Sequence, residues 1–202
     1  MSQPTVIPSG DLARLITTEL SATGAELGAA LDAMDEAGRL AFLDSLGKDE
    51  IVDLFERLAL RPAAPADFVS PTPGATLICE GINSLPLFRR FQKRFAALAD
   101  GQDPLGYNHQ PLAWLTGPGY FKVSASKDRA GEVLFDYTAL PERAPSGWPP
   151  IQPNDQGFSA LVYAGMVDVM RRISRDLFVG AAYKQGRRSG DYFVLCRTGW
   201  PT

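Results

Sequence analysis

Hydrophobic and polar residues alternate with a period of two in two neighbouring segments near the middle of the chain, residues 119–126 and 132–140. This period is typical of a β-strand with one buried face. The polar residues between the segments end in Gly131, which readily adopts a positive φ. A shorter apolar run, residues 111–116, lies just upstream. We therefore predict three antiparallel strands joined by hairpins.

The C-terminal part of the chain has the same organisation with one exception. Residues 177–184 and 191–197 predict two strands that flank the glycine-bounded turn QGRRSG, and residues 158–163 predict another strand. In residues 166–175 the apolar positions recur every three residues, which predicts a short helix instead.

On this predicted helix, Asp168 would face the solvent together with Arg171 and Arg172. Side chains three or four residues apart on an exposed helix face form ion pairs that contribute little to stability. We favour this interpretation. Alternatively, the two arginines bind a carboxylate or a phosphate, which matches the geometry of the guanidinium group.

The first 60 residues have a helical period instead of an alternating one. Apolar residues three and four apart predict short amphipathic helices at residues 9–20, 24–34, 35–46 and 48–60. None of these helices is long enough to be stable alone in water. We therefore expect them to pack on one another, on the rest of the chain or on a partner protein.

Residues 84–98 predict a further helix. Its leucines and phenylalanines form one apolar stripe, and arginines and a lysine flank that stripe. We favour a helix that faces the core and has a solvated basic edge. The alternative is a basic lip over an acidic partner or ligand.

Two proline-rich segments divide the chain. Residues 61–74 contain four prolines and predict a semi-extended linker between an acidic helical segment, residues 1–60, and a second domain, residues 75–202. Residues 141–154 are also rich in proline and surround Trp148. Long connections of this kind often serve as lids or binding loops, although Trp148 alternatively only holds the loop on the surface.

The composition is that of a globular protein, with 45% hydrophobic and 21% charged residues in a chain of 202. No apolar run is long enough to span a membrane, and no signal peptide is evident, so we expect a cytoplasmic protein. Residues 1–60 contain eleven acidic and four basic residues, and the remainder contains sixteen basic and twelve acidic residues. This modest basic excess does not predict nucleic-acid binding.

Several kinds of site have no signature in the sequence. It contains no glycine-rich phosphate loop, no dinucleotide-binding motif and no nucleophile elbow. One histidine and two distant cysteines, Cys79 and Cys196, do not form an ordinary metal site. We therefore expect no cofactor and no metal, and we expect both cysteines to be buried free thiols.

The hairpin-linked strands, the one short helix before the last hairpin and the ending LFVGAAYKQGRRSGDYFVLCR resemble the small antiparallel barrels of the lipocalin-like (calycin) group over residues 105–197. The sequence GYF at residues 119–121 is a loose version of the glycine-aromatic motif of the first lipocalin strand. The resemblance implies an α+β fold with an antiparallel β-barrel or strongly curved sheet after short amphipathic helices. It also implies an interior that binds a small apolar molecule.

Three residues are candidates for acid-base chemistry. His109 is the only histidine, and its side chain titrates near neutral pH. Asp136 lies in a predicted strand beside Tyr137, and it would need a cationic or hydroxyl partner if it faced the interior. With Tyr120 and Tyr137 it would then form an acid-base set. Alternatively, His109 is structural or exposed, and Asp136 faces outward.

Aromatic and basic side chains of the predicted barrel are candidate contacts for a ligand, because binding pockets combine aromatic walls with a few polar groups. These candidates are Tyr107, Trp114, Tyr120, Lys122, Tyr163, Arg171 and Tyr183.

Three functions remain open. The first is binding of a small hydrophobic or aromatic molecule in a pocket lined by Trp114, Tyr120, Phe135 or Tyr137, Tyr163 and Tyr183. The second is a cofactor-independent lyase, isomerase or hydrolase in the same pocket, with His109 as the base and with Asp136 or Tyr137 as the acid or as the group that orients the base. The third is a protein-interaction module in which residues 9–60 dock a partner.

Overall fold

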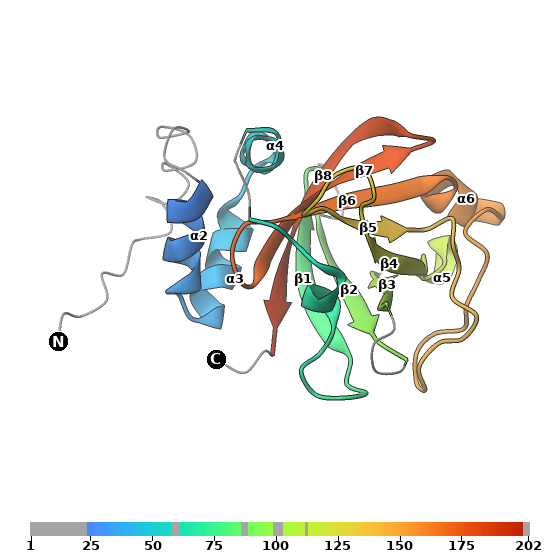
Figure 1. Cartoon of the computed structure of the whole chain (residues 1–202). Coiled ribbons are helices and arrows are strands. Elements are labelled where there is room, and N and C mark those ends of the chain that lie inside the picture. Colours follow the sequence, from blue (N-terminus) through green and yellow to red (C-terminus); the bar gives the residue numbers. More distant parts are fainter. Residues whose placement is uncertain (1–23, 58–60, 86–88, 99–102, 112, 200–202) are drawn as a thin grey trace.

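A closed antiparallel barrel forms the body of the protein. The computed structural model describes residues 24–57, 61–85, 89–98, 103–111 and 113–199. Within them, each strand pairs with its neighbours in sequence, and the first pairs with the last (Figure 1). The strands are β1 (Leu77–Asn83), β2 (Arg90–Ala96), β3 (Leu105–His109), β4 (Phe121–Ala125), β5 (Val133–Asp136), β6 (Met166–Arg172), β7 (Leu177–Lys184) and β8 (Arg187–Thr198). The predicted α+β fold with an antiparallel barrel is confirmed.

Three helices cover one outer side of the barrel, α2 (Gly24–Asp32), α3 (Glu36–Ser45) and α4 (Lys48–Glu56) (Figure 1). They match three of the predicted helices, and the one predicted at residues 9–20 lies outside the described residues. The buried side chains between them and β1, β7 and β8 include Phe42, Leu54, Phe55, Val179 and Val194. The apolar faces of these helices are therefore covered by the barrel. None of the helices in the described part of the chain is both long and apolar enough to cross a membrane.

Aromatic side chains fill one half of the barrel interior. Phe68, at the end of the short helix η1 (Pro65–Phe68), is fully buried. Its ring lies 5.1 Å from that of Phe95, 4.9 Å from that of Phe135 and 4.8 Å from that of Phe178, measured between centroids. The proline-rich segment thus contributes a side chain to the barrel core. The division of the chain at this segment stays a prediction.

The hairpin predicted between β4 and β5 is confirmed, with Val123 opposite Phe135. The last predicted hairpin is also confirmed, although its turn is tighter than the sequence QGRRSG indicated. Lys184 pairs with Arg187 across a loop of only Gln185 and Gly186. Both loop residues have positive φ, 51° and 75°, as in the type I′ turns that fit the twist of two-residue hairpins.

Two predicted helices are strands in the structure. Residues 84–98 contain β2, whose phenylalanines at 91 and 95 lie four residues apart. That spacing fits one face of a helix and one face of a strand equally well. Residues 166–175 contain β6, whose Asp168 and Met170 are buried and whose outward Val169 packs against the helices. Because both faces of β6 contact protein, its apolar residues do not alternate cleanly with polar ones.

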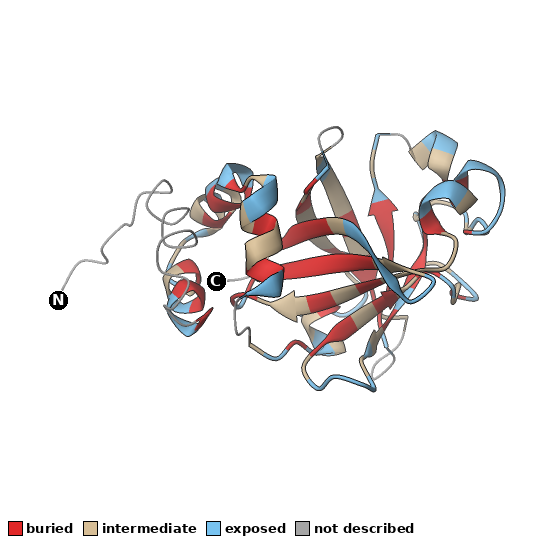
Figure 2. Cartoon of the chain, turned by 90° about the horizontal axis from the view of Figure 1, so that it is seen from above, coloured by how far each residue is buried: buried red, intermediate tan, exposed pale blue. Residues whose placement is uncertain are grey.

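Two predicted strands are instead short helices, α5 (Ala113–Thr116) and α6 (Gly157–Tyr163). The third strand of the predicted meander is β3, upstream of α5. Both short helices lie on the opposite side of the barrel from α2–α4 (Figures 1 and 2). Their apolar residues are largely exposed, and therefore an apolar run did not indicate a buried strand here.

The packing of Phe68 gives a first prediction. Phe68→Ala removes a fully buried ring at the end of the barrel, and we expect the free energy of unfolding to fall by about 3–5 kcal/mol. The measurement is urea unfolding followed by circular dichroism. The matched control is Phe158→Ala on α6, whose side chain is 60% exposed, with an expected change within about 0.5 kcal/mol. Equal losses for the two variants would contradict the packing described.

Candidate functional site

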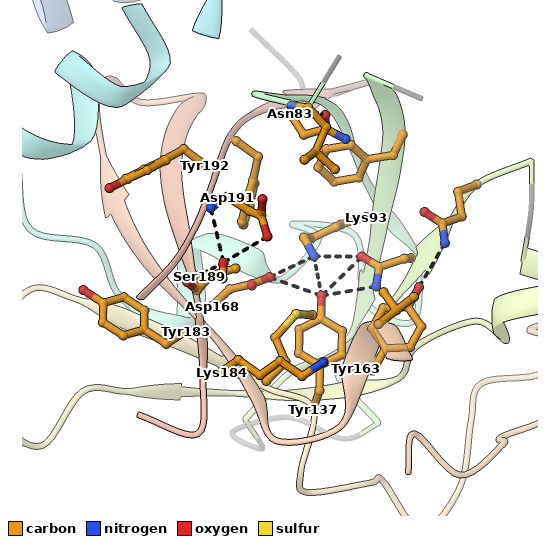
Figure 3. Close-up of a pocket in the computed structure, with 18 of the residues that line it drawn as sticks. Asn83, Lys93, Tyr137, Tyr163, Asp168, Tyr183, Lys184, Ser189, Asp191 and Tyr192 are labelled. Atoms are coloured by element: carbon orange, nitrogen blue, oxygen red, sulfur yellow. Dashed lines mark hydrogen bonds and ion pairs between the residues drawn. The ribbon is translucent and has the colours of Figure 1, made fainter. Parts of the chain in front are cut away.

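The other half of the barrel interior is an open cavity of about 380 Å³. This size falls within the range of small-molecule sites. The lining comes from β1–β3, β6–β8, the residue after β5, and α6. The aromatic wall consists of Phe91, Tyr137, Tyr163, Tyr183, Tyr192 and Phe193. Most of the labelled side chains in Figure 3 surround this space.

Four buried polar side chains form the inner end of the cavity, and we call them the floor cluster: Lys93, Asn108, Tyr137 and Asp168. The Lys93 ammonium donates hydrogen bonds to Asn108 Oδ1 (2.7 Å), to Asp168 Oδ2 (3.1 Å) and to the Tyr137 hydroxyl. The Tyr137 hydroxyl donates to Asp168 Oδ2 at 3.2 Å. Figure 3 shows these groups converging from different strands.

The register of the paired strands brings these four residues together. Lys93 lies between the inward positions Phe91 and Phe95 on β2, and it faces Asn108 on the neighbouring strand β3. Asp168 lies opposite Phe135 on β5, two residues before Tyr137. Side chains two apart on a strand share a face. All four residues therefore point into the barrel.

Tyr137 is held in place by a second tyrosine. Its ring stacks on that of Tyr163, with centroids 5.3 Å apart and planes within 4°. Gly119 packs against the other tyrosine, because a Cβ at this position would overlap the Tyr163 ring. Gly119 also has a positive φ of 58°, which glycine adopts without strain. The motif GPG before β4 thus shapes one wall of the cavity.

Burial shifts the pKa of each ionisable group in the floor cluster toward its neutral form. Loss of solvation lowers the pKa of Lys93, and the nearby Asp168 opposes this shift. Loss of solvation likewise raises the pKa of Asp168, against the effect of Lys93. The pKa of Tyr137 lies well above 10, because of burial and then the charge of Asp168. The pKa values of Lys93 and Asp168 are therefore shifted toward one another.

Aromatic rings further stabilise the Lys93 ammonium. Its nitrogen lies 5.0 Å from the ring centre of Phe121 and 5.1 Å from that of Phe193. Such cation–π contacts contribute most where the cation is removed from water. The floor cluster therefore lies at the boundary between the aromatic core and the open cavity.

Three of the candidate residues line the cavity, namely Tyr137, Tyr163 and Tyr183. Sequence analysis missed Lys93 and placed Asp168 on an exposed helix face, where the structure has it 3% exposed and paired with Lys93. The available signals were the lysine two residues from a phenylalanine on either side, and the aspartate two residues from a methionine on either side. In a strand, residues two apart share a face, so both signals favour a strand with an inward charge.

Three aromatic candidates lie outside the cavity. Tyr107 and Tyr120 are buried beneath the proline-rich loop, where the ring of Tyr107 lies 4.7 Å from that of Trp148 and the Tyr120 hydroxyl donates to the Pro149 carbonyl at 2.6 Å. Trp114 is 80% exposed on α5. The prediction that Trp114 and Tyr120 line the interior is therefore wrong. Trp114 lies on a short exposed helix and not on a strand, and Tyr120 faces the proline-rich loop.

The remaining candidates also lie away from the floor cluster. His109 is exposed at the end of β3, and partial desolvation and Arg94 lower its pKa. Asp136 accepts hydrogen bonds from the backbone and hydroxyl of Thr138, at 2.8 and 2.6 Å. Lys122 lies exposed on β4 opposite Asp136. The structure does not bring His109 and Asp136 together with Tyr137.

Arg171 connects the barrel to α4. Its guanidinium donates to Glu132 Oε1 at 2.9 and 2.7 Å and to the Phe55 carbonyl at 2.7 Å. The predicted surface ion pair of Asp168 with Arg171 or Arg172 is wrong, because β6 sends the aspartate inward.

The fold and the cavity define a small antiparallel β-barrel with an interior site that opens at one end. Comparisons of the chain with protein-family models, with curated proteins and with solved structures found no match. The likeness to lipocalin-like proteins therefore rests on the eight-stranded barrel. In the part of the chain that the structure describes, no three His, Cys, Asp or Glu side chains gather as metal ligands.

The buried ion pair gives a prediction with a defined pH dependence. Lys93→Met leaves Asp168 buried without its cation, so its folded-state pKa rises further above the ordinary value of 3.8. Below that value the carboxyl is protonated in both the folded and the unfolded states. As the pH rises, the unfolded state ionises freely and the folded state does not. We expect the deficit in unfolding free energy to be small at about pH 4 and to reach about 3–5 kcal/mol at neutral pH.

The measurement is urea unfolding of the variant and the wild type across this pH range. Lys122→Met is the matched control, because Lys122 is exposed on the outer face of β4. Its effect should stay within about 0.5 kcal/mol at every pH. A deficit for Lys93→Met that does not change with pH would show that Asp168 is not ionised against Lys93.

Proposed function

We propose that the chain binds a small molecule with an aromatic or apolar body in the open half of the barrel, with a polar group of that molecule on the floor cluster. The observation that carries this proposal is the combination of an aromatic wall with one buried polar cluster at its inner end. Pockets for small molecules commonly pair an apolar lining with a few polar groups that fix orientation.

The mouth of the cavity supports the same function. In the described part of the chain, the large hydrophobic side chains that are exposed lie in the β1–β2 connection, in α5 and in α6. Three of them, Leu85, Leu161 and Val162, line the cavity itself. Exposed apolar residues grouped around a concave site favour ligand binding over chance exposure. An apolar ligand body would remove these side chains from water.

Native mass spectrometry of the protein purified from its own host tests the proposal. A small molecule that stays with the folded protein and is released on denaturation is the expected result. A folded protein that carries no molecule, or that carries only a second polypeptide, would contradict it.

A blocked cavity gives the matching prediction. Ala182 lines the cavity and is nearly buried, and Ala182→Phe should place a ring in the space of the ligand. We expect about a tenfold or greater loss of affinity, measured as the fraction of protein that carries the molecule in native spectra. Trp114→Ala and His109→Gln are controls, since neither residue lines the cavity, and both should retain the molecule. Unchanged occupancy in Ala182→Phe would argue against this site.

A second function is favoured by the contact of Lys93, Asp168 and Tyr137. Three ionisable groups within hydrogen-bonding distance, all with shifted pKa values, are also the arrangement of a proton-transfer enzyme. The chain would then be a cofactor-independent lyase, isomerase or hydrolase. In D₂O, a lyase or isomerase that moves a proton at carbon should place deuterium on a carbon of the recovered molecule, and Tyr137→Phe should slow this exchange. If deuterium is not incorporated faster than in buffer alone, these two activities are excluded.

A further inference from the structure

Every hydrogen-bond donor of the floor cluster already has an acceptor within the protein. An ammonium group has three N–H donors, and those of Lys93 go to Asn108, Tyr137 and Asp168. The two amide hydrogens of Asn108 go to the Gly119 carbonyl (3.4 Å) and to the Tyr137 hydroxyl (3.2 Å). The single hydroxyl hydrogen of Tyr137 goes to Asp168 or to Asn108. A ligand therefore finds no unused donor in this cluster.

One acceptor of the cluster, Asp168 Oδ1, receives no hydrogen bond from the described residues. Both hydrogen bonds to the Asp168 carboxylate end on Oδ2. The side chain is 3% exposed and lines the cavity. Oδ1 is not among the fully buried polar atoms that lack a partner, so it is accessible from the cavity. A ligand group that donates to it therefore forms a hydrogen bond to a charged group.

The charged side chains that line the cavity balance in number, but their existing hydrogen bonds favour the same kind of ligand. They are Lys93, Lys184, Asp168 and Asp191. Lys93 is neutralised by Asp168, and Lys184 donates to the Leu161 carbonyl on α6 (2.9 Å). The charge of Asp191 acts on Asp168, whose pKa it raises further. The lining therefore carries two carboxylates and two ammonium groups. Both ammonium groups already donate to protein acceptors, and Lys93 has no unused donor.

The aromatic wall adds to this preference, because ring faces attract cations. The same rings already surround the Lys93 ammonium: Phe91 and Phe193 lie within 5.6 and 5.1 Å of its nitrogen and also line the cavity. A carboxylate ligand would instead meet Asp168 and Asp191 without an unused Lys93 donor.

We propose that the ligand is a small aromatic amine whose protonated amino group donates a hydrogen bond to Asp168 Oδ1 while its ring lies against the aromatic wall. This inference rests on the proposed function, since it names the class of molecule that occupies the same cavity.

Calorimetry with three probes of similar size tests the inference: 2-phenylethylamine, 2-phenylethanol and 3-phenylpropionate. We expect the amine to bind about tenfold or more tightly than the alcohol, and the carboxylate to bind most weakly. If the alcohol or the carboxylate binds at least as tightly as the amine, the inference is overturned and the proposed function stands. Binding of none of the three overturns the inference, and native spectra without a bound molecule would then overturn the function as well.

A double variant isolates the acceptor. Lys93→Met with Asp168→Leu removes both charges together, which avoids the unpaired buried charge that a single substitution leaves. We expect this variant to remain folded and to bind the amine no more tightly than the alcohol. The matched control is Lys122→Met with Asp136→Leu, a pair that faces one another on the outer side of β4 and β5, and it should keep the wild-type preference. An amine preference that survives in the floor variant would overturn the inference.

Discussion

The pairing of β1 with β8 is the constraint on which the rest of the structure depends. This ladder joins strands more than a hundred residues apart and turns an open meander into a barrel without sheet edges. Closure creates an inside and an outside for every strand. It places Phe68, Phe95, Phe135 and Phe178 in one interior cluster, and it leaves the outer face of β7, β8 and β1 to be covered by α2–α4.

The barrel interior is divided into two halves with different chemistry. Interlocking aromatic rings fill one half, whereas the other half is open and ends on four polar side chains. Removing Lys93 and Asp168 from water is costly, and the hydrogen bonds of Asn108 and Tyr137 offset part of that cost. A pair of apolar residues would fill the same space at least as well for stability. Stability alone therefore does not account for the charges at this point, and the cavity that they face supports a role in binding.

Two sets of contacts cover the outer surface of the barrel. Arg171 on β6 donates hydrogen bonds to the Phe55 carbonyl on α4 and to Glu132, the residue before β5. On another face, the proline-rich loop covers Tyr107 and Tyr120 with Trp148, whose indole donates to Thr76. Both of these contacts lie on the outside of the sheet, whereas α6 contributes Leu161, Val162 and Tyr163 to the lining of the cavity.

Local pattern in the sequence determined the hairpins β4–β5 and β7–β8 and the helices α2–α4, because each depends on residues near one another and on a clear period of two or of about 3.6. The expectation of a barrel came from the resemblance to lipocalin-like proteins. Local pattern did not determine β2 and β6. Phe91 and Phe95 fit both periods, and β6 has protein on both faces. The partners of Lys93 and Asp168 lie 15 to 75 residues away. Only closure of the barrel decides which side chains meet in its interior, since that contact depends on the register of strands that the sequence pattern leaves open.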